Sequence, residues 1–296
     1  MDWAGQIFSW IYQYFDNMAF LMLAAVGLIL IYGMMGVINM AHGELMMIGA
    51  YVATATYHAG APMPLSVIAA GVAAALAGVV MEQLVIRHFY NQLLSSLVVT
   101  WGLSMILSQG ALLLLGPATM NMPTPYGSFD VGALSFSVYR MVMAGVAIGL
   151  VILVWALFRF TPFGINARAA MENPRMTAAL GVNTRRLYTG VFALGAALGG
   201  VAGAMFAQTA AVSPFFGQSY TPMAFITVAL GGGANAILGL VYATLYLAGV
   251  QTTFANVFNQ YVGYISIMAA AFVCLLAMPE GISDYVQKRR ARAMAR

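Results

Sequence analysis

The chain has few charged residues. Only 7% of its 296 residues are Asp, Glu, Lys or Arg, whereas 62% are hydrophobic. A soluble domain carries roughly 25% charged residues, so this composition excludes a chain built mainly of water-soluble domains. The mean hydropathy of +0.87 indicates a protein that crosses a membrane several times. A membrane β-barrel would need alternating segments of about 10 residues. The apolar runs here are continuous, and we expect helices: an all-α polytopic membrane protein.

Lysine and cysteine are almost absent. Lys288 is the one lysine and Cys274 the one cysteine in the sequence, so no disulfide can form within the chain. A P-loop needs a lysine beside a glycine-rich turn, and hydrolysis of nucleotide by that route is therefore not expected. The histidines, His42, His58 and His88, do not have the spacing of a metal site. We expect no enzymatic activity and no cofactor held by this chain.

Apolar segments predict about 8–9 transmembrane helices. We place them near 17–36, 40–57, 64–86, 93–116, 138–158, 187–209, 220–233, 236–254 and 261–279. Residues 3–15 carry an aromatic stripe, and two interpretations stay open: an interfacial helix, or an extension of the first span.

The basic residues predict the topology. They concentrate at Arg87, in the stretch 159–186 and in the tail 284–296. Because cytoplasmic loops are rich in Lys and Arg, we expect these three segments in the cytoplasm. The N-terminus and the loop 117–137 then lie outside, and the C-terminus inside. We expect a multi-pass membrane protein, with lipid but no nucleic acid among its partners.

Two segments, one in each half of the chain, are unusual. Residues 38–50 and 226–239 both place small and polar residues among apolar ones. Paired short or interrupted helices of opposite direction mark the translocation path in many transporters. We therefore expect an inverted repeat with short or broken central helices.

Several side chains near these segments are candidates for a translocation path. His42 and Glu44 allow two interpretations, a site lining or gating the path, or a pair satisfied by water or helix termini at the cytoplasmic interface. Gln218 and Tyr220 offer hydrogen bonds and a rigid wall to a neutral polar solute. The whole candidate set is Asn39, His42, Glu44, Thr100, Gln218, Tyr220, Gly231, Gly232 and Gly233. Glu82, by contrast, is expected to extend to the interface in a structural role.

The stretch 159–186 holds five of the twelve basic residues. Its Thr-Pro-Phe-Gly sequence should break the preceding helix. Two short helices are then expected, the first ended by Asn173-Pro174 and the second closed by Gly181. Two helices in a cytoplasmic loop favour protein docking, with lipid headgroups as the alternative. The residues assigned to docking are Thr161, Pro162, Gly164, Arg168, Glu172, Asn173 and Gly181.

Taken together, these motifs resemble those of ABC-importer permeases for branched-chain amino acids and urea. The resemblance runs from about residue 20 to 283 and rests on five segments in order: 36–51, 100–104, 161–183, 199–203 and 279–281. It implies a single permease domain over 1–283 in the bacterial inner membrane, followed by the basic cytoplasmic tail 284–296. The stretch 159–186 resembles the family's cytoplasmic coupling loop and is called the coupling loop below.

The resemblance also implies partners. Permeases of this family work in pairs, commonly with a second, different permease and alternatively with a copy of themselves. Two cytoplasmic ATPase subunits bind ATP and Mg, and an extracytoplasmic binding protein delivers the solute. The segments 100–104 and 217–220 resemble the urea-type branch, so urea or a short amide is preferred over an amino acid. A stand-alone channel or secondary transporter for a small polar solute is the alternative.

Overall fold

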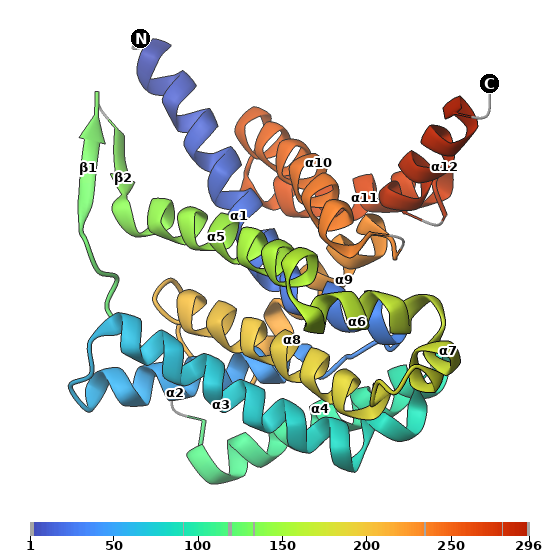
Figure 1. Cartoon of the computed structure of the whole chain (residues 1–296). Helices are drawn as coiled ribbons and strands as arrows, with labels where there is room; N and C mark the ends of the chain where they lie inside the picture. The colour runs from blue at the N-terminus through green and yellow to red at the C-terminus, as the bar shows by residue number, and fades with distance from the viewer. Residues whose placement is uncertain are drawn as a thin grey trace. The chain divides into compact units, whose positions relative to one another are not determined.

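A computed structural model describes residues 3–90, 92–117, 120–132, 134–233, 235–279 and 281–294 (Figure 1). The α-helices are α1 (Trp3–Met35), α2 (His42–His58), α3 (Met63–Leu84), α4 (Leu93–Leu115), α5 (Val138–Phe160), α6 (Pro162–Glu172), α7 (Pro174–Ala179), α8 (Thr184–Phe206), α9 (Thr221–Gly231), α10 (Ala236–Val257), α11 (Gln260–Ala277) and α12 (Ile282–Met294). The short 3-10 helices are η1 (Ile86–Phe89) and η2 (Phe216–Ser219), and the strands are β1 (Ser128–Val131) and β2 (Leu134–Ser137).

The predicted all-α polytopic membrane fold is confirmed. Within the described residues, seven helices are long and apolar enough to cross a membrane. The two segments predicted to be unusual are short helices: α2 has 17 residues and α9 has 11. The total of 8–9 crossings stays a prediction, because it depends on whether both short helices span the bilayer. The tail expected at 284–296 belongs, as far as Met294, to α12.

The first helix is continuous. α1 runs for 33 residues, so residues 3–15 extend the first span, which is the second of the two interpretations. No proline or glycine interrupts the sequence between Gly5 and Gly27, and nothing local therefore separates an interfacial segment from the span.

A β-hairpin, which the sequence analysis did not foresee, lies within the loop 117–137. β1 and β2 pair antiparallel, with Ser128 opposite Ser137 and Phe129 opposite Phe136. Gly127 and Gly132 take positive φ values at 62° and 64° on either side of β1, conformations that glycine adopts without a steric cost. Phe136 also packs edge-on against Phe8 of α1, and the hairpin is thereby attached to the N-terminal part of that helix.

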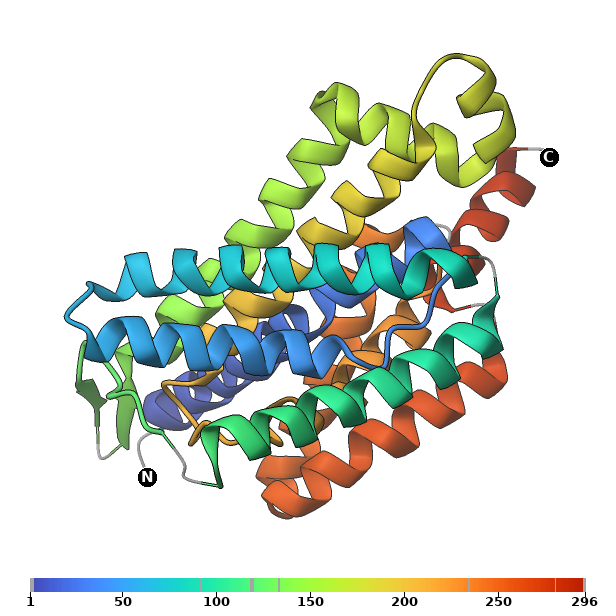
Figure 2. The same cartoon turned by 90° about the horizontal axis from the view of Figure 1, so that it is seen from below.

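The chain divides into two compact units. Unit 1 comprises residues 1–25, 124–151 and 223–296, and unit 2 comprises 26–123 and 152–222. α2, α3 and α8 pack against one another in unit 2, and Figure 2 shows α2 and α3 side by side. Small residues permit the close approach of these helices: a Cβ on Gly203 would lie 1.9 Å from the backbone oxygen of Met46, and one on Gly49 2.2 Å from that of Gly200.

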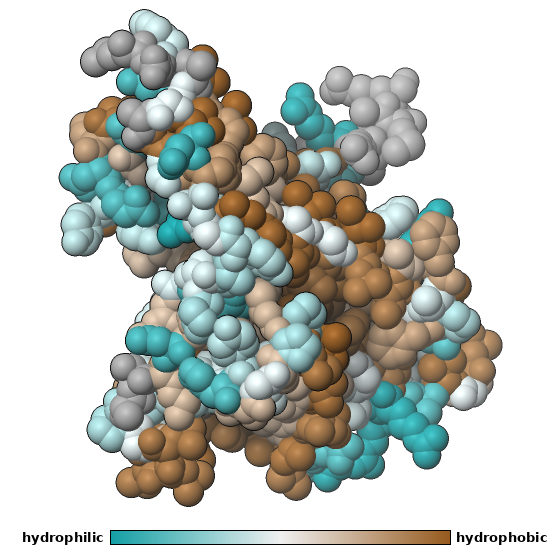
Figure 3. Space-filling view, turned by 90° about the vertical axis from the view of Figure 1, so that its left-hand side faces the viewer, coloured by the Kyte–Doolittle hydropathy of each residue, from teal (hydrophilic) through white to brown (hydrophobic). Residues whose placement is uncertain are grey.

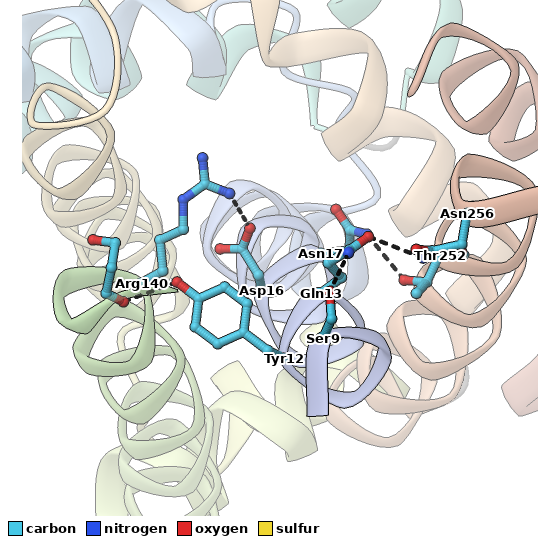
Figure 4. A network of polar contacts seen from close by, with 9 residues as sticks. Ser9, Tyr12, Gln13, Asp16, Asn17, Arg140, Thr252 and Asn256 are labelled. Carbon is cyan, nitrogen blue, oxygen red and sulfur yellow. Dashed lines mark hydrogen bonds and ion pairs between the residues drawn. The ribbon is translucent and has the colours of Figure 1, made fainter. Parts of the chain in front are cut away.

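Polar side chains join the helices of unit 1 (Figure 4). Asn17 of α1 donates to Thr252 Oγ1 at 3.0 Å, and Asn256 of α10 donates to Gln13 Oε1 at 2.9 Å. On its other side α1 carries Asp16, which forms an ion pair with Arg140 of α5. α1 is therefore held to both α5 and α10 by hydrogen bonds and charge as well as by apolar contacts.

The outer surfaces of the long helices are apolar. Figure 3 shows extended hydrophobic areas on one face of the molecule. Leu76 and Leu84 of α3 and Leu113 and Leu114 of α4 are each more than 60% exposed. Exposed leucines along helices of this length are typical of a surface that contacts lipid.

Candidate functional site

The chain is unwound between α1 and α2 in unit 2. Residues 36–39 have no regular structure, and Gly36 takes a positive φ of 59°. Backbone groups inside a membrane protein need hydrogen-bond partners. The fully buried Asn39 supplies one, because its Oδ1 accepts from the Ala41 N–H at 3.1 Å. Its Nδ2 donates no hydrogen bond within the described part of the chain.

Helix α4 supplies further partners through a row of hydroxyl groups, here called the hydroxyl ladder. Its members are Ser96, Thr100, Ser104 and Ser108, and all four are buried. Ser96 Oγ accepts from the Ile38 N–H at 3.3 Å and Thr100 Oγ1 accepts from the Met40 N–H at 3.0 Å. The ladder therefore stabilises the unwound stretch. The sequence analysis named only Thr100 of these four residues. Their spacing of four residues, which places all four hydroxyls on one helix face, was a signal that could have identified the other three.

Glu44 is buried beside Ser104, the third residue of the hydroxyl ladder. It lies in the first turn of α2 and is 1% exposed. Ser104 Oγ donates to Glu44 Oε1 at 2.5 Å. The Gln218 amide approaches the same carboxylate, but Oε2 accepts no hydrogen bond of normal geometry from the described residues. Glu44 forms no ion pair with any described residue. The ion pair found among those residues is Asp16–Arg140. The first turn of a helix favours negative charge, which stabilises the carboxylate in part.

His42 and Tyr220 are packed close to this cluster. The His42 ring lies against backbone, since a Cβ on Gly27 or on Gly199 would come within 2.9 Å of its Cε1 atom. Tyr220 stacks obliquely on Phe206, with ring centroids 4.8 Å apart. His42 and Glu44 are both buried, so interfacial water does not solvate them. Of the second interpretation, only the contact with a helix terminus remains, because both residues lie in the first turn of α2.

Gln218 lies at the exposed edge of the ladder. Its Nε2 donates to Ser108 Oγ at 3.4 Å, and the residue itself is exposed. The neighbouring Gly217 contacts the start of α2, because a Cβ there would lie 1.9 Å from the Gly43 oxygen. The structure thus brings together, within unit 2, six of the nine predicted path residues: Asn39, His42, Glu44, Thr100, Gln218 and Tyr220.

The glycine triplet belongs to unit 1. Gly231 ends α9, and Gly232 follows with a positive φ of 79°. A Cβ on Gly239 would lie 2.3 Å from the Gly231 oxygen, and one on Gly281 2.6 Å from Gly232 Cα. The triplet therefore allows α9 to end where α10 and the start of α12 approach its backbone. Whether Gly231, Gly232 or Gly233 also contacts a solute stays a prediction.

The coupling loop folds as two short helices, as predicted. The Thr161 side chain caps α6 by accepting from the Gly164 N–H at 3.2 Å, and Pro162 occupies the first turn. Asn173 ends α6 and caps α7, where its Oδ1 accepts from the Met176 N–H at 3.0 Å. Gly181, with a φ of 87°, then closes α7. Gly164 is required for a further reason, because a Cβ there would lie 2.3 Å from the Phe158 Cα of the preceding helix.

The outer face of the coupling loop combines apolar and charged side chains. Arg168 and Glu172 are exposed, and no ion pair between them occurs in the described structure. Ile165, Met176 and Leu180 are exposed as well, Leu180 by 78%. Apolar groups beside charges on capped helices are typical of a surface that binds another protein.

Glu82 has the structural role that we expected, but its side chain is buried instead of extending to the interface. It is fully buried at the end of α3. Tyr90 O–H donates to its Oε1, and Thr189 Oγ1 of α8 donates to its Oε2 at 2.7 Å. Burial and the hydrogen bond to Glu82 raise the pKa of Tyr90, so the phenol stays protonated and able to donate. The cluster links α3 to the first turns of α8, next to the coupling loop.

Comparison with known proteins identifies the family. The model of the branched-chain amino acid transport system permease component matches residues 11–278. The chain belongs to this family. It is therefore a multi-pass membrane protein and a permease of the ABC-importer type, a transport subunit and not a catalytic one.

Relatives of this permease occur in several bacteria. The high-affinity branched-chain amino acid transport system permease protein LivH of Salmonella typhimurium is 31% identical, over 88% of this chain and 90% of its own. BraD of Pseudomonas aeruginosa, a permease protein of the same kind of system, is 30% identical over the same shares. The guanosine ABC transporter permease protein NupQ of Bacillus subtilis is 27% identical over 82% of each chain. No solved structure matches the permease at a significant level.

Proposed function

We propose that this permease forms the membrane passage of an ATP-driven importer for an amino acid. The coupling loop is the observation that carries the ATP-driven part: two capped helices expose Ile165, Met176 and Leu180 together with Arg168 and Glu172. The chain lacks a P-loop, so an ATPase must supply the energy. Docking of such a subunit would bury these apolar groups.

The proposed complex contains further subunits. A second permease completes the passage, as a different chain or as a copy of this one. Two cytoplasmic ATPase subunits bind ATP and Mg, and an extracytoplasmic binding protein delivers the solute. In the bacterial inner membrane the N-terminus and the β-hairpin then lie outside, and the coupling loop and the C-terminus inside, as the positive-inside rule requires.

The substrate is assigned to the amino acids instead of urea. The names of the relatives favour an amino acid and give no support to the preference for urea. The chemistry of the hydroxyl ladder agrees. Glu44 is a buried carboxylate whose Oε2 accepts no hydrogen bond of normal geometry from the described residues, and an amino acid brings an ammonium group that would pair with it. Urea is neutral and has no such group. We propose that the solute passes along Asn39, Glu44, Thr100 and Gln218.

The docking assignment is tested by reversing charge on the coupling loop. Arg168→Glu and Glu172→Arg should each lower solute uptake at least tenfold in proteoliposomes that hold the complete complex, while the ATPase subunits still hydrolyse ATP. Both side chains are exposed, so the fold of the permease should be unaffected. Arg289→Glu, which reverses an exposed charge in α12 outside the coupling loop, serves as the control. Full coupled uptake in both loop variants would refute the docking assignment.

A further inference from the structure

A groove on unit 1 is lined by the N-terminal half of α1 and the first turns of α5. It encloses about 170 Å³. Its walls are apolar and partly aromatic, and its polar groups are the Asp16–Arg140 pair and the Tyr12 hydroxyl. The walls include Ile11, Phe15, Met141 and Ala144, and Asp16 and Arg140 are the charged residues of the lining.

The length of α5 indicates the level of the groove in the bilayer. Arg140 and Arg159 lie near opposite ends of this helix, about 19 positions and hence roughly 28 Å apart at ~1.5 Å per residue. This is about the thickness of the hydrocarbon core of a bilayer, ~30 Å. Arginines at these two places would each reach a headgroup region, whichever way the chain is oriented. The Asp16–Arg140 pair is therefore at headgroup depth.

The ion pair presents both signs of charge to a ligand. Asp16 is 14% exposed and Arg140 is 49% exposed in their side chains. In Figure 4 the guanidinium extends over the carboxylate. Arg140 bonds Asp16 through Nη1 alone, whereas a guanidinium carries five N–H donors, and Asp16 bonds through one of its two oxygens. Because the two charges compensate each other, a purely anionic headgroup would gain little here.

We propose that this groove binds a zwitterionic phospholipid with a primary ammonium group, such as phosphatidylethanolamine. Its phosphate accepts hydrogen bonds from Arg140, its ammonium donates to Asp16, and one acyl chain lies in the groove. Phe15 and Met141, which adjoin the ion pair in sequence, are 45% and 50% exposed, which suits a wall at the boundary between the headgroups and the acyl chains of a bilayer. A free amino acid carries the same two charges, but it would have to enter through that apolar side.

The headgroup is tested first on the unaltered chain. The purified full-length permease is mixed in detergent with phosphatidylethanolamine, phosphatidylcholine and phosphatidylglycerol of identical acyl chains, and bound lipid is counted by native mass spectrometry. Phosphatidylethanolamine should be retained at least tenfold more than the other two, because the trimethylated ammonium cannot donate to Asp16. Equal retention of the three lipids would overturn the proposal.

Variants then locate the site. Arg140→Gln and Asp16→Asn should bring phosphatidylethanolamine down to the level of phosphatidylcholine. Ala144→Trp should lower the retention of all three lipids, because it fills the groove and leaves the ion pair in place. Arg159→Gln, an exposed arginine at the other end of α5, should change nothing.

Folding of each variant is checked by its elution volume and its midpoint of thermal unfolding. Unchanged lipid retention in folded Ala144→Trp would place the lipid elsewhere and refute the site. Displacement of the lipid by millimolar L-leucine would assign the groove to a free amino acid and would also overturn the lipid proposal.

Discussion

At the scale of single residues, the transport proposal depends most on Glu44. Its carboxylate is buried and bonded by Ser104. Glu44→Gln keeps the size and a hydrogen-bond acceptor but removes the charge. We expect kcat/KM for amino-acid uptake to fall at least tenfold, since hydrogen bonds to charged groups contribute about 1.5–3 kcal/mol and ~1.4 kcal/mol corresponds to a factor of ten. Uptake is measured with radiolabelled leucine in proteoliposomes.

Thr56→Ala is the matched control for Glu44→Gln. Thr56 lies on the same helix and its hydroxyl bonds only to backbone oxygens of that helix, Val52 and Ala53. This variant should transport like the unaltered chain. Equal uptake by Glu44→Gln and the unaltered chain would show that the carboxylate does not contact the solute.

Single residues were predictable where a local rule governs them. Pro162, Asn173 and Gly181 were placed correctly because proline, asparagine and glycine at helix ends act through neighbouring backbone. Glu82 was not, because its partners Tyr90 and Thr189 come from other elements. Asp16 and Arg140 were missed for the same reason: they meet only after α1 and α5 pack.

At the scale of elements, glycine contacts hold α2 against α8. A Cβ on Gly203 would lie 1.9 Å from the Met46 oxygen. Gly203→Ala should therefore force the two helices apart, and overpacking of this kind costs about 1–3 kcal/mol. The measurement is the midpoint of thermal unfolding in detergent, which should fall.

Gly110→Ala provides the comparison for this packing. Gly110 lies within α4, and a Cβ there meets nothing within 4 Å. Alanine should leave the unfolding midpoint unchanged or raise it, because it favours helix by up to about 1 kcal/mol over glycine. The same midpoint for Gly203→Ala and Gly110→Ala would mean that α2 and α8 are not packed as described.

The elements themselves could mostly be predicted, since long apolar runs and helix breakers are local signals. α6 and α7 follow from Pro162, Asn173 and Pro174. The β-hairpin could not be predicted, because its strands are four residues each and depend on the contact of Phe136 with Phe8. The inverted repeat stays a prediction, although both segments that motivated it are short helices.

At the scale of the whole molecule, composition alone indicated a polytopic membrane protein, and the absence of a P-loop indicated a separate source of energy. The family match over residues 11–278 agrees with both. The substrate could not be predicted from the sequence, because hydroxyl and amide groups such as those of Thr100 and Gln218 suit urea and an amino acid equally. The proposed distinction rests on the pairing of an ammonium group with Glu44, whose burial only the fold shows.

The most direct test of the transport proposal is uptake of labelled leucine and labelled urea by proteoliposomes. The vesicles contain this chain with its partner permease, ATPase subunits and binding protein, and each measurement is made with and without ATP. We predict leucine uptake that requires both ATP and the ATPase subunits, with no urea uptake above that of empty vesicles. Uptake of either solute by this chain without an ATPase would contradict an ATP-driven importer, and ATP-dependent uptake of urea alone would contradict the assignment of an amino acid.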